Sequence, residues 1–251
     1  MKKLVLLGIV AALIFCGCQN REPETRRLPS ELPKLKASFS ALYTLLRQEN
    51  SGDLPSDALA ALAPEGGTGV IQPRDSDRQK RFSAKSDFYF KEILQYMESI
   101  RVSEPQKTDV SALAQQLDAC VNRMGHQLNQ MNLSAAQEAI NDGIEVVAQM
   151  YRCGGREEEA AVLHLEYCLN LLEIVSGSEE RLSEALDLTQ AGIDELEGEG
   201  SLYRFRLSEL KESLKSLRDA ALYRDSRLVC MKVEVMREGF EDISALTSKR
   251  E

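Results

Sequence analysis

The chain has 251 residues and a net charge of −9, and 43% of its residues are hydrophobic. This length suits one domain with a sizeable core. The acidic excess disfavours nucleic acid as a partner, because DNA and RNA are bound largely through Lys and Arg contacts with phosphates. Tryptophan is absent and only 6% of the residues are aromatic, which is typical of helices packed through Leu, Ile, Val and Ala.

The amino-terminal segment has the composition of an export signal. Lys2 and Lys3 precede an uninterrupted apolar run over residues 4–15, which is the order of the charged and hydrophobic regions of a secretory signal peptide. A transmembrane helix needs roughly 20 apolar residues, and the chain becomes polar directly after Cys18. We therefore expect residues 1–17 to be cleaved rather than retained as a membrane span.

Gly17 and Cys18 close this segment, which resembles the lipobox of bacterial lipoproteins, where a small residue precedes the cysteine that becomes lipidated. Cys18 fits because Gly17 precedes it, whereas lipidation of Cys16 would place the bulky Phe15 at the cleavage position. The segment departs from the usual lipobox at Phe15 and Cys16, where leucine and a small residue are commonest. The resemblance implies acyl chains such as palmitate on Cys18, and an ordinary secretory cleavage nearby is the alternative.

Lipidation of Cys18 would hold the protein at a membrane without any span, because several acyl chains anchor durably where one binds marginally. Loss of the leader removes two lysines and no acidic residue, which would lower the net charge from −9 to −11. In enteric bacteria the residue after the cysteine directs sorting, so Gln19 implies the outer membrane where a cell has two. We expect residues 18–28 to form a tether and residues 29–251 a single helical domain.

Helical periodicity dominates residues 29–251, and no segment alternates like a strand. Apolar residues at three- and four-residue spacing predict a first helix over residues 32–52 and a second over residues 84–102. Residues 51–83, rich in proline and glycine, predict a long loop in which residues 56–63 could form a short helix. Loops of this length are uncommon inside compact domains and are usually functional or disordered.

The third and fourth helices are predicted from a seam and from a cap. The third begins near Thr108, and its apolar seam continues to Met131. Ser134, with a glutamine three residues later, predicts the capping box of the fourth helix. Gly154 and Gly155 should end that helix, because glycine favours the position after a helix carboxyl end.

The last four helices follow in close succession. The fifth, over residues 157–175, starts with three glutamates that suit the helix dipole, and it is apolar nearly all round, which predicts a central, buried helix. A serine-capped sixth helix ends in a turn over residues 197–200. Apolar seams of different phase predict helices over residues 203–221 and 229–243, with a break near residues 224–226.

Three helical hairpins follow one another about every 45 residues, beginning near Ala84, Ser134 and Ser178. Tyr151, Gly155 and Ala160 stand four and five residues apart in turn, so the hairpin over residues 134–176 resembles a tetratricopeptide repeat. It departs from the family at Ser176 and Gly177, which replace the usual closing proline. The predicted fold class is all-α: about seven or eight helices in antiparallel hairpins that form a bundle or a short tetratricopeptide-like solenoid.

Four cysteines lie beyond the leader, and an exported location permits disulfides between them: Cys120, Cys153, Cys168 and Cys230. Cys153 ends one helix and Cys168 lies about thirteen residues into the next, an offset of roughly 18 Å along a hairpin. A disulfide needs Cα atoms within about 7 Å, so this pairing is disfavoured. A bridge from either of them to Cys120 or Cys230 stays open, as do four free thiols that pack like small hydrophobic residues.

Few residues suggest chemistry. His164 and Cys168 lie one turn apart and could share a metal ion, but nothing near them in the sequence completes the three or four ligands of a metal site, and Glu166 and Asn170 lie on other sides of the helix. The glycine-rich residues 66–69 lack the strand and the Gly-Lys-Ser or Gly-Lys-Thr of a phosphate-binding loop, and no catalytic serine elbow or dinucleotide pattern occurs. We therefore expect no catalytic residue, no metal and no cofactor.

An anchored, all-helical chain without catalytic motifs predicts a non-enzymatic module that binds or scaffolds another protein of the cell envelope. The alternative is an envelope lipoprotein that binds a small molecule or a lipid in a cavity between its helices. The expected partners are the membrane, through the lipid on Cys18, and an envelope protein that the sequence does not identify. Nucleic acid is not an expected partner.

Overall fold

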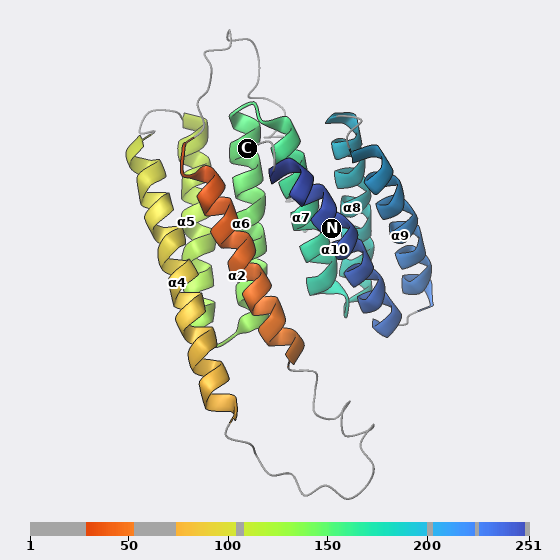
Figure 1. Ribbon diagram of the computed structural model, residues 1–251, viewed down its shortest axis with the longest axis horizontal. Helices are drawn as coiled ribbons and strands as arrows, with labels where there is room; N and C mark the ends of the chain where they lie inside the picture. Colours follow the sequence, from red (N-terminus) through yellow and green to blue (C-terminus); the bar gives the residue numbers. More distant parts are fainter. Residues whose placement is uncertain (1–28, 53–73, 104–107, 200–202, 224–225, 249–251) are drawn as a thin grey trace, which may run out of the picture.

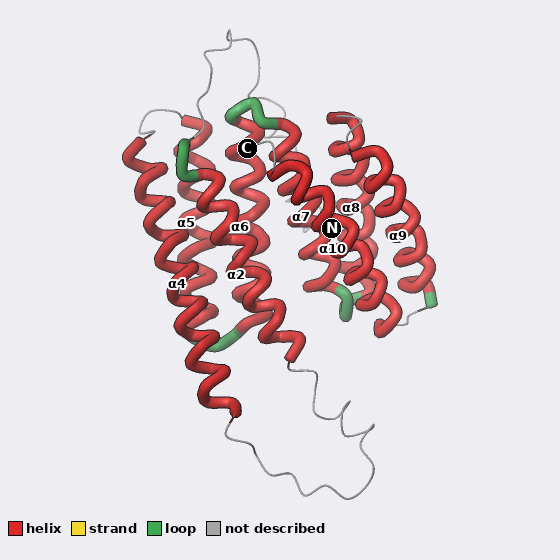
Figure 2. Tube along the Cα trace, viewed as in Figure 1, coloured by secondary structure: helices red, strands yellow, loops and turns green. Residues whose placement is uncertain are grey.

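The computed structural model describes residues 29–52, 74–103, 108–199, 203–223 and 226–248. Helices joined by short loops make up this part of the chain, and no strand occurs in it (Figure 2). The eight helices of the described residues are α2 (Leu32–Gly52), α4 (Arg74–Ser103), α5 (Thr108–Asn129), α6 (Leu133–Cys153), α7 (Glu157–Val175), α8 (Glu179–Glu199), α9 (Arg204–Leu222) and α10 (Ser226–Ser248). The predicted all-α fold class is confirmed.

The helices fall into two groups of four, which we call the amino-terminal bundle (α2, α4, α5 and α6) and the carboxy-terminal bundle (α7 to α10) (Figure 1). In each bundle, helices that are consecutive in the chain pack together, and the last helix packs back against the first. This is the arrangement of an up-and-down four-helix bundle. Packing of α6 against α7 joins the two bundles.

Each bundle has its own hydrophobic core. Phe39, Leu117 and Ile140 are among the buried residues of the amino-terminal core, and Leu207 and Met236 are among those of the carboxy-terminal core. Helix α7 contributes side chains to both cores. Its central, buried position confirms the prediction made from its apolar residues, since a helix that is apolar on all sides must be covered on all sides.

Helix α4 begins earlier than predicted. It starts at Arg74 rather than near Ala84, so the long loop predicted over residues 51–83 extends too far at its carboxyl end. Phe82 is the only apolar residue among residues 74–83, and the others are charged or polar. Hydrophobic periodicity therefore gave no signal there. Arg, Lys and Gln are good helix formers, and the burial of Phe82 fixes this end of α4 to the core.

The capping box predicted at Ser134 is wrong. The N-cap of α6 is Asn132, whose side-chain oxygen accepts a hydrogen bond from the backbone N–H of Ala135 at 3.3 Å. Asparagine is as good an N-cap as serine, and Asn132 directly follows a turn in which Met131 adopts a φ of 55°. The other end of α6 is as predicted, because Gly154 is its C-cap and Gly155, one residue later, adopts a φ of 75°.

Two further boundaries differ from prediction. Helix α8 continues to Glu199, so most of the turn predicted over residues 197–200 is helical. The hairpin predicted to begin near Ala84 is loose, since α4 packs mainly against α2 and touches α5 at few places. Helix α9 ends at Leu222 and α10 begins at Ser226, on either side of the break predicted near residues 224–226, and residues 224–225 lie outside the described part of the chain.

A close approach holds α2 against α6. A Cβ atom added at Gly143 of α6 would overlap the ring of Phe39 from α2, so only glycine leaves room for this packing.

Residues 1–28 and 53–73 lie outside the described part of the chain. The predictions for the leader, for the tether and for a short helix over residues 56–63 therefore remain predictions.

Candidate functional site

Two polar clusters lie on opposite sides of α7. In the first, the Nδ1 atom of His164 lies 2.8 Å from a carboxylate oxygen of Glu145 on α6, and the Nε2 atom lies 3.7 Å from the Sγ atom of Cys168. A thiol, an imidazole and a carboxylate thus stand in the order found in nucleophilic active sites. We call these three residues the His164 cluster.

The His164 cluster favours the charged imidazole. Burial lowers the pKa of His164, but hydrogen bonds with Cys168 and Glu145 and the charge of Glu145 outweigh it and raise the pKa to about 10. The His164–Glu145 contact is therefore an ion pair at neutral pH, and it joins α7 to α6. The ring of His164 also stacks on Tyr167, with centroids 5.9 Å apart.

The thiol of this cluster is closed to a substrate. Cys168 is 0% exposed, and its Sγ atom donates to the backbone carbonyl of Leu188 on α8 at 3.6 Å. A nucleophile must reach the substrate, so the arrangement as it stands joins three helices rather than presenting a reactive group. Among the described residues, no three His, Cys, Asp or Glu side chains gather closely enough to hold a metal ion.

Sequence reasoning placed His164 and Cys168 on one helix face but missed Glu145. A signal for it exists in the hairpin. Glu145 stands nine residues before Gly154, and His164 stands nine residues after Gly155. Positions equally far from a tight turn lie side by side in an antiparallel pair of helices, so the turn predicts the contact.

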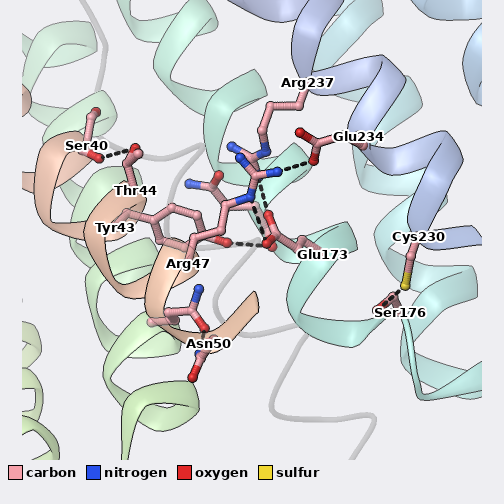
Figure 3. A network of polar contacts seen from close by, with 12 residues as sticks. Ser40, Tyr43, Thr44, Arg47, Asn50, Glu173, Ser176, Cys230, Glu234 and Arg237 are labelled. Carbon is pink, nitrogen blue, oxygen red and sulfur yellow. Dashed lines mark hydrogen bonds and ion pairs between the residues drawn. The ribbon is translucent and has the colours of Figure 1, made fainter. Parts of the chain in front are cut away.

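The second cluster lies where α2 meets α7 and α10, and we call it the inter-bundle seam (Figure 3). Glu173 of α7 accepts a hydrogen bond from Arg47 Nε of α2 at 3.0 Å and another from Arg237 Nη2 of α10 at 2.6 Å. Arg47 also pairs with Glu234 of α10. One carboxylate thus ties together helices from both bundles.

Uncharged groups continue the seam along α7. The hydroxyl of Tyr43 donates to the backbone carbonyl of Asn170 at 3.3 Å, and the guanidinium of Arg237 lies 5.7 Å from the centroid of the Tyr43 ring. One turn further along, Ser40 donates to Glu166 at 2.7 Å. The prediction that Glu166 and Asn170 lie away from the His164 face of the helix is confirmed.

Burial sets the direction in which the pKa values of the ionisable groups in the seam are shifted. Burial raises the pKa of Tyr43, the charge of Glu173 raises it further, and Arg237 and Arg47 only partly offset both effects. Burial also raises the pKa of Glu166, against the opposing hydrogen bond from Ser40. Both groups therefore favour their uncharged forms more than they would in water.

The seam contains buried polar atoms without hydrogen-bond partners. Asn170 is 0% exposed, and neither its Nδ2 nor its Oδ1 atom has a hydrogen-bond partner among the described residues; Nε of Arg237 has none there either. A buried polar group left in this state costs about 1–3 kcal/mol. These atoms of Asn170 and Arg237 could therefore form further hydrogen bonds, which no described side chain provides.

The four cysteines beyond the leader form no disulfide in the structure. Cys120 and Cys168 are buried, Cys153 is half-buried, and Cys230 is exposed on α10. The pairing of Cys153 with Cys168, disfavoured by their offset, is absent, and so are the bridges to Cys120 or Cys230 that the spacing left open.

Comparison of the chain with protein-family models, with curated proteins and with solved structures gave no match. The resemblances of the leader to a lipobox and of residues 134–176 to a tetratricopeptide repeat therefore stay predictions. Among the described helices, none combines the length and the apolar character that a bilayer crossing requires.

Proposed function

We propose that this chain is a lipid-anchored helical protein of the bacterial cell envelope that acts as a non-enzymatic interaction or scaffold module. The observation that carries the proposal is the leader, in which a charged start and an apolar run end in Gly17 and Cys18. The all-helical architecture supports it, since packed helices offer broad faces to a partner. The burial of the Cys168 thiol adds support, because it leaves the His164 cluster without access for a substrate.

The anchor is tested by metabolic labelling with palmitate in a bacterial host. The wild-type chain should incorporate label and fractionate with membranes, because Cys18 carries the acyl chains. Cys18→Ala should lose both properties, while Cys16→Ala should keep them. Labelling that persists in Cys18→Ala would contradict the assignment of this residue.

The interaction role is tested by mild crosslinking in intact cells followed by purification under denaturing conditions. The wild-type chain should recover one or more envelope proteins that Cys18→Ala does not recover, because only the anchored chain is held beside its partner. Recovery of the same proteins with both chains, or of none with either, would count against an anchored scaffold.

A second candidate function is the binding of a small polar molecule between the helices. The specific observation in its favour is Asn170, whose two side-chain amide atoms are buried and have no hydrogen-bond partner among the described residues. A ligand with both a donor and an acceptor would satisfy such an amide. Native mass spectrometry of the purified protein should then show a retained small molecule that is lost in Asn170→Leu.

A further inference from the structure

Exposed apolar side chains are frequent at the end of α9 and along the first half of α10. Of the nine large hydrophobic residues that are exposed on the described surface, four lie between residues 222 and 235. Leu222 and Tyr223, at the end of α9, are 80% and 81% exposed, and Met231 and Val235 of α10 are 59% and 51% exposed. Single exposed apolar residues need no explanation, whereas a cluster of them indicates an interaction surface.

Met231 and Val235 on α10 lie in a stripe, a row of exposed residues that has a charged residue at each end. Arg227, Met231, Val235 and Glu238 follow one another at helical spacing and are all exposed, which places them on the same side of the helix. The buried residues of α10, which include Val233, occupy the opposite side. Neither Arg227 nor Glu238 takes part in an ion pair among the described residues.

The stripe is complementary to itself when reversed. It carries a positive charge at one end, two apolar residues in the middle and a negative charge at the other end. In a two-fold symmetric contact, residue i of one copy meets residue j of the other, and j meets i. An antiparallel pair of α10 helices would therefore bring Met231 against Val235 and Arg227 against Glu238, each contact occurring twice.

We propose that this face of α10 is the interface with a second copy of the chain, in an antiparallel α10–α10 arrangement. Glu238 in the stripe and the acidic net charge of the chain, −9, would be repelled by anionic headgroups, which favours a second copy over a membrane surface. The inference stands apart from the proposed function, since it requires no lipid. The apolar area is small beside the roughly 1,600 Å² of a standard interface, so we expect a weak, reversible dimer.

The first test is the oligomeric state of the full-length chain carrying Cys18→Ala, so that no lipid drives association, measured by sedimentation in mild detergent over a range of concentrations. The chain should pass from monomer to dimer. Met231→Asp should weaken dimerisation at least tenfold, about the effect of one buried charge at each of two equivalent places. Phe88→Asp, at a residue of α4 that is 56% exposed, is the matched control and should leave dimerisation unchanged.

A charge swap tests the antiparallel register. Arg227→Glu alone and Glu238→Arg alone should each weaken the dimer severalfold, because each places like charges opposite one another at two positions. The double variant exchanges the two charges and should restore the wild-type dissociation constant. Circular dichroism should show the same helix content in every variant, so that a loss of dimer is not a loss of fold.

Cys230 provides an independent measure of the geometry. In the proposed arrangement, the symmetry axis passes near Val233, which places the two Cys230 Cα atoms roughly 12 Å apart, given a rise of about 1.5 Å per residue and an interaxial distance of about 8–10 Å. This exceeds the reach of a disulfide. A short bismaleimide should therefore join two wild-type chains, mild oxidation should not join them through Cys230, and Cys230→Ser should abolish the crosslink.

Three results would overturn the proposal. The first is a chain that stays monomeric at every concentration. The second is a dimer that is indifferent to Met231→Asp or is not restored by the charge swap. The third is a monomer whose binding to phosphatidylglycerol vesicles depends on Met231, which would assign the surface to a membrane instead.

Discussion

His164 holds a proton that its surroundings make difficult to remove. Its Nδ1 atom pairs with Glu145, and its Nε2 atom faces the Cys168 thiol. Because Cys168 is buried, the contacts of His164, Glu145 and Cys168 serve to hold α6, α7 and α8 together. The same three residue types would indicate catalysis if the sulfur were open to solvent, so exposure decides between the two interpretations.

The His164–Glu145 pair should make stability depend on pH above neutrality. The pKa of His164 is about 10 in the folded chain, against an ordinary value of 6.5. A raised pKa in the folded state contributes stability that is fully present below about pH 6.5 and is lost as the pH rises through about 10. Urea unfolding at these two pH values should show the loss, and Glu145→Gln should reduce it.

His126 offers the control for this experiment, because it is exposed on α5. His126→Gln should leave the pH dependence as it is in the wild-type chain. A wild-type chain that is equally stable at both pH values would show that the pair contributes nothing.

Asn170 should be replaceable by an apolar residue of similar size. Since neither of its side-chain amide atoms has a partner in the described part of the chain, Asn170→Leu removes a buried polar group and should stabilise the chain by about 1–3 kcal/mol in urea unfolding. Asn141→Leu is the contrast, because Nδ2 of Asn141 donates to the carbonyl of Tyr167 at 3.1 Å and the variant loses that bond. Destabilisation by Asn170→Leu would indicate that the amide binds a molecule from solution.

At the scale of the helices, caps and close contacts set the boundaries that periodicity leaves undefined. Both Asn132 and Ser134 can cap a helix, and the structure assigns the cap of α6 to Asn132. Apolar spacing cannot separate two candidates that lie two residues apart. It also cannot detect the start of α4, where the residues are polar and the helix forms on propensity and on the single anchor Phe82.

The cap of α6 can be tested with a matched pair of variants. Asn132→Ala should destabilise the chain by about 1 kcal/mol, because the N–H of Ala135 loses its acceptor. Ser134→Ala should change stability little, since Ser134 lies inside the helix and alanine is the better helix former. Thermal unfolding of the two variants side by side measures the difference, and a larger effect at Ser134 would favour the capping box instead.

At the scale of the whole molecule, the inter-bundle seam supplements the packing of α6 against α7. Helices α2 and α10 both lie on the near side of the molecule in Figure 1, and their long side chains meet over α7 at Glu173. Glu173 is 27% exposed and Arg237 is 12% exposed. Ion pairs that are withdrawn from water to this extent are sensitive to the loss of one partner, because the remaining charges stay partly buried.

Glu173→Gln should therefore weaken the connection between the two bundles. We expect a loss of about 1–3 kcal/mol and a broader unfolding transition in calorimetry, because the bundles then unfold less cooperatively. Glu138→Gln removes an exposed partner of Arg181 and should have little effect, as is usual for surface pairs. Identical behaviour of the two variants would show that the seam does not couple the bundles.

The sequence by itself determined the helical class, most helix bounds and the central place of α7, because apolar periodicity and glycine ends are local signals. It also carries the leader and Cys18, which lie outside the described residues. Only the tertiary structure decided that the helices close into two bundles, that Glu145 meets His164 and that Glu173 binds two arginines. Those contacts join residues 19, 64 and 126 positions apart, and such pairings depend on packing that no local pattern encodes.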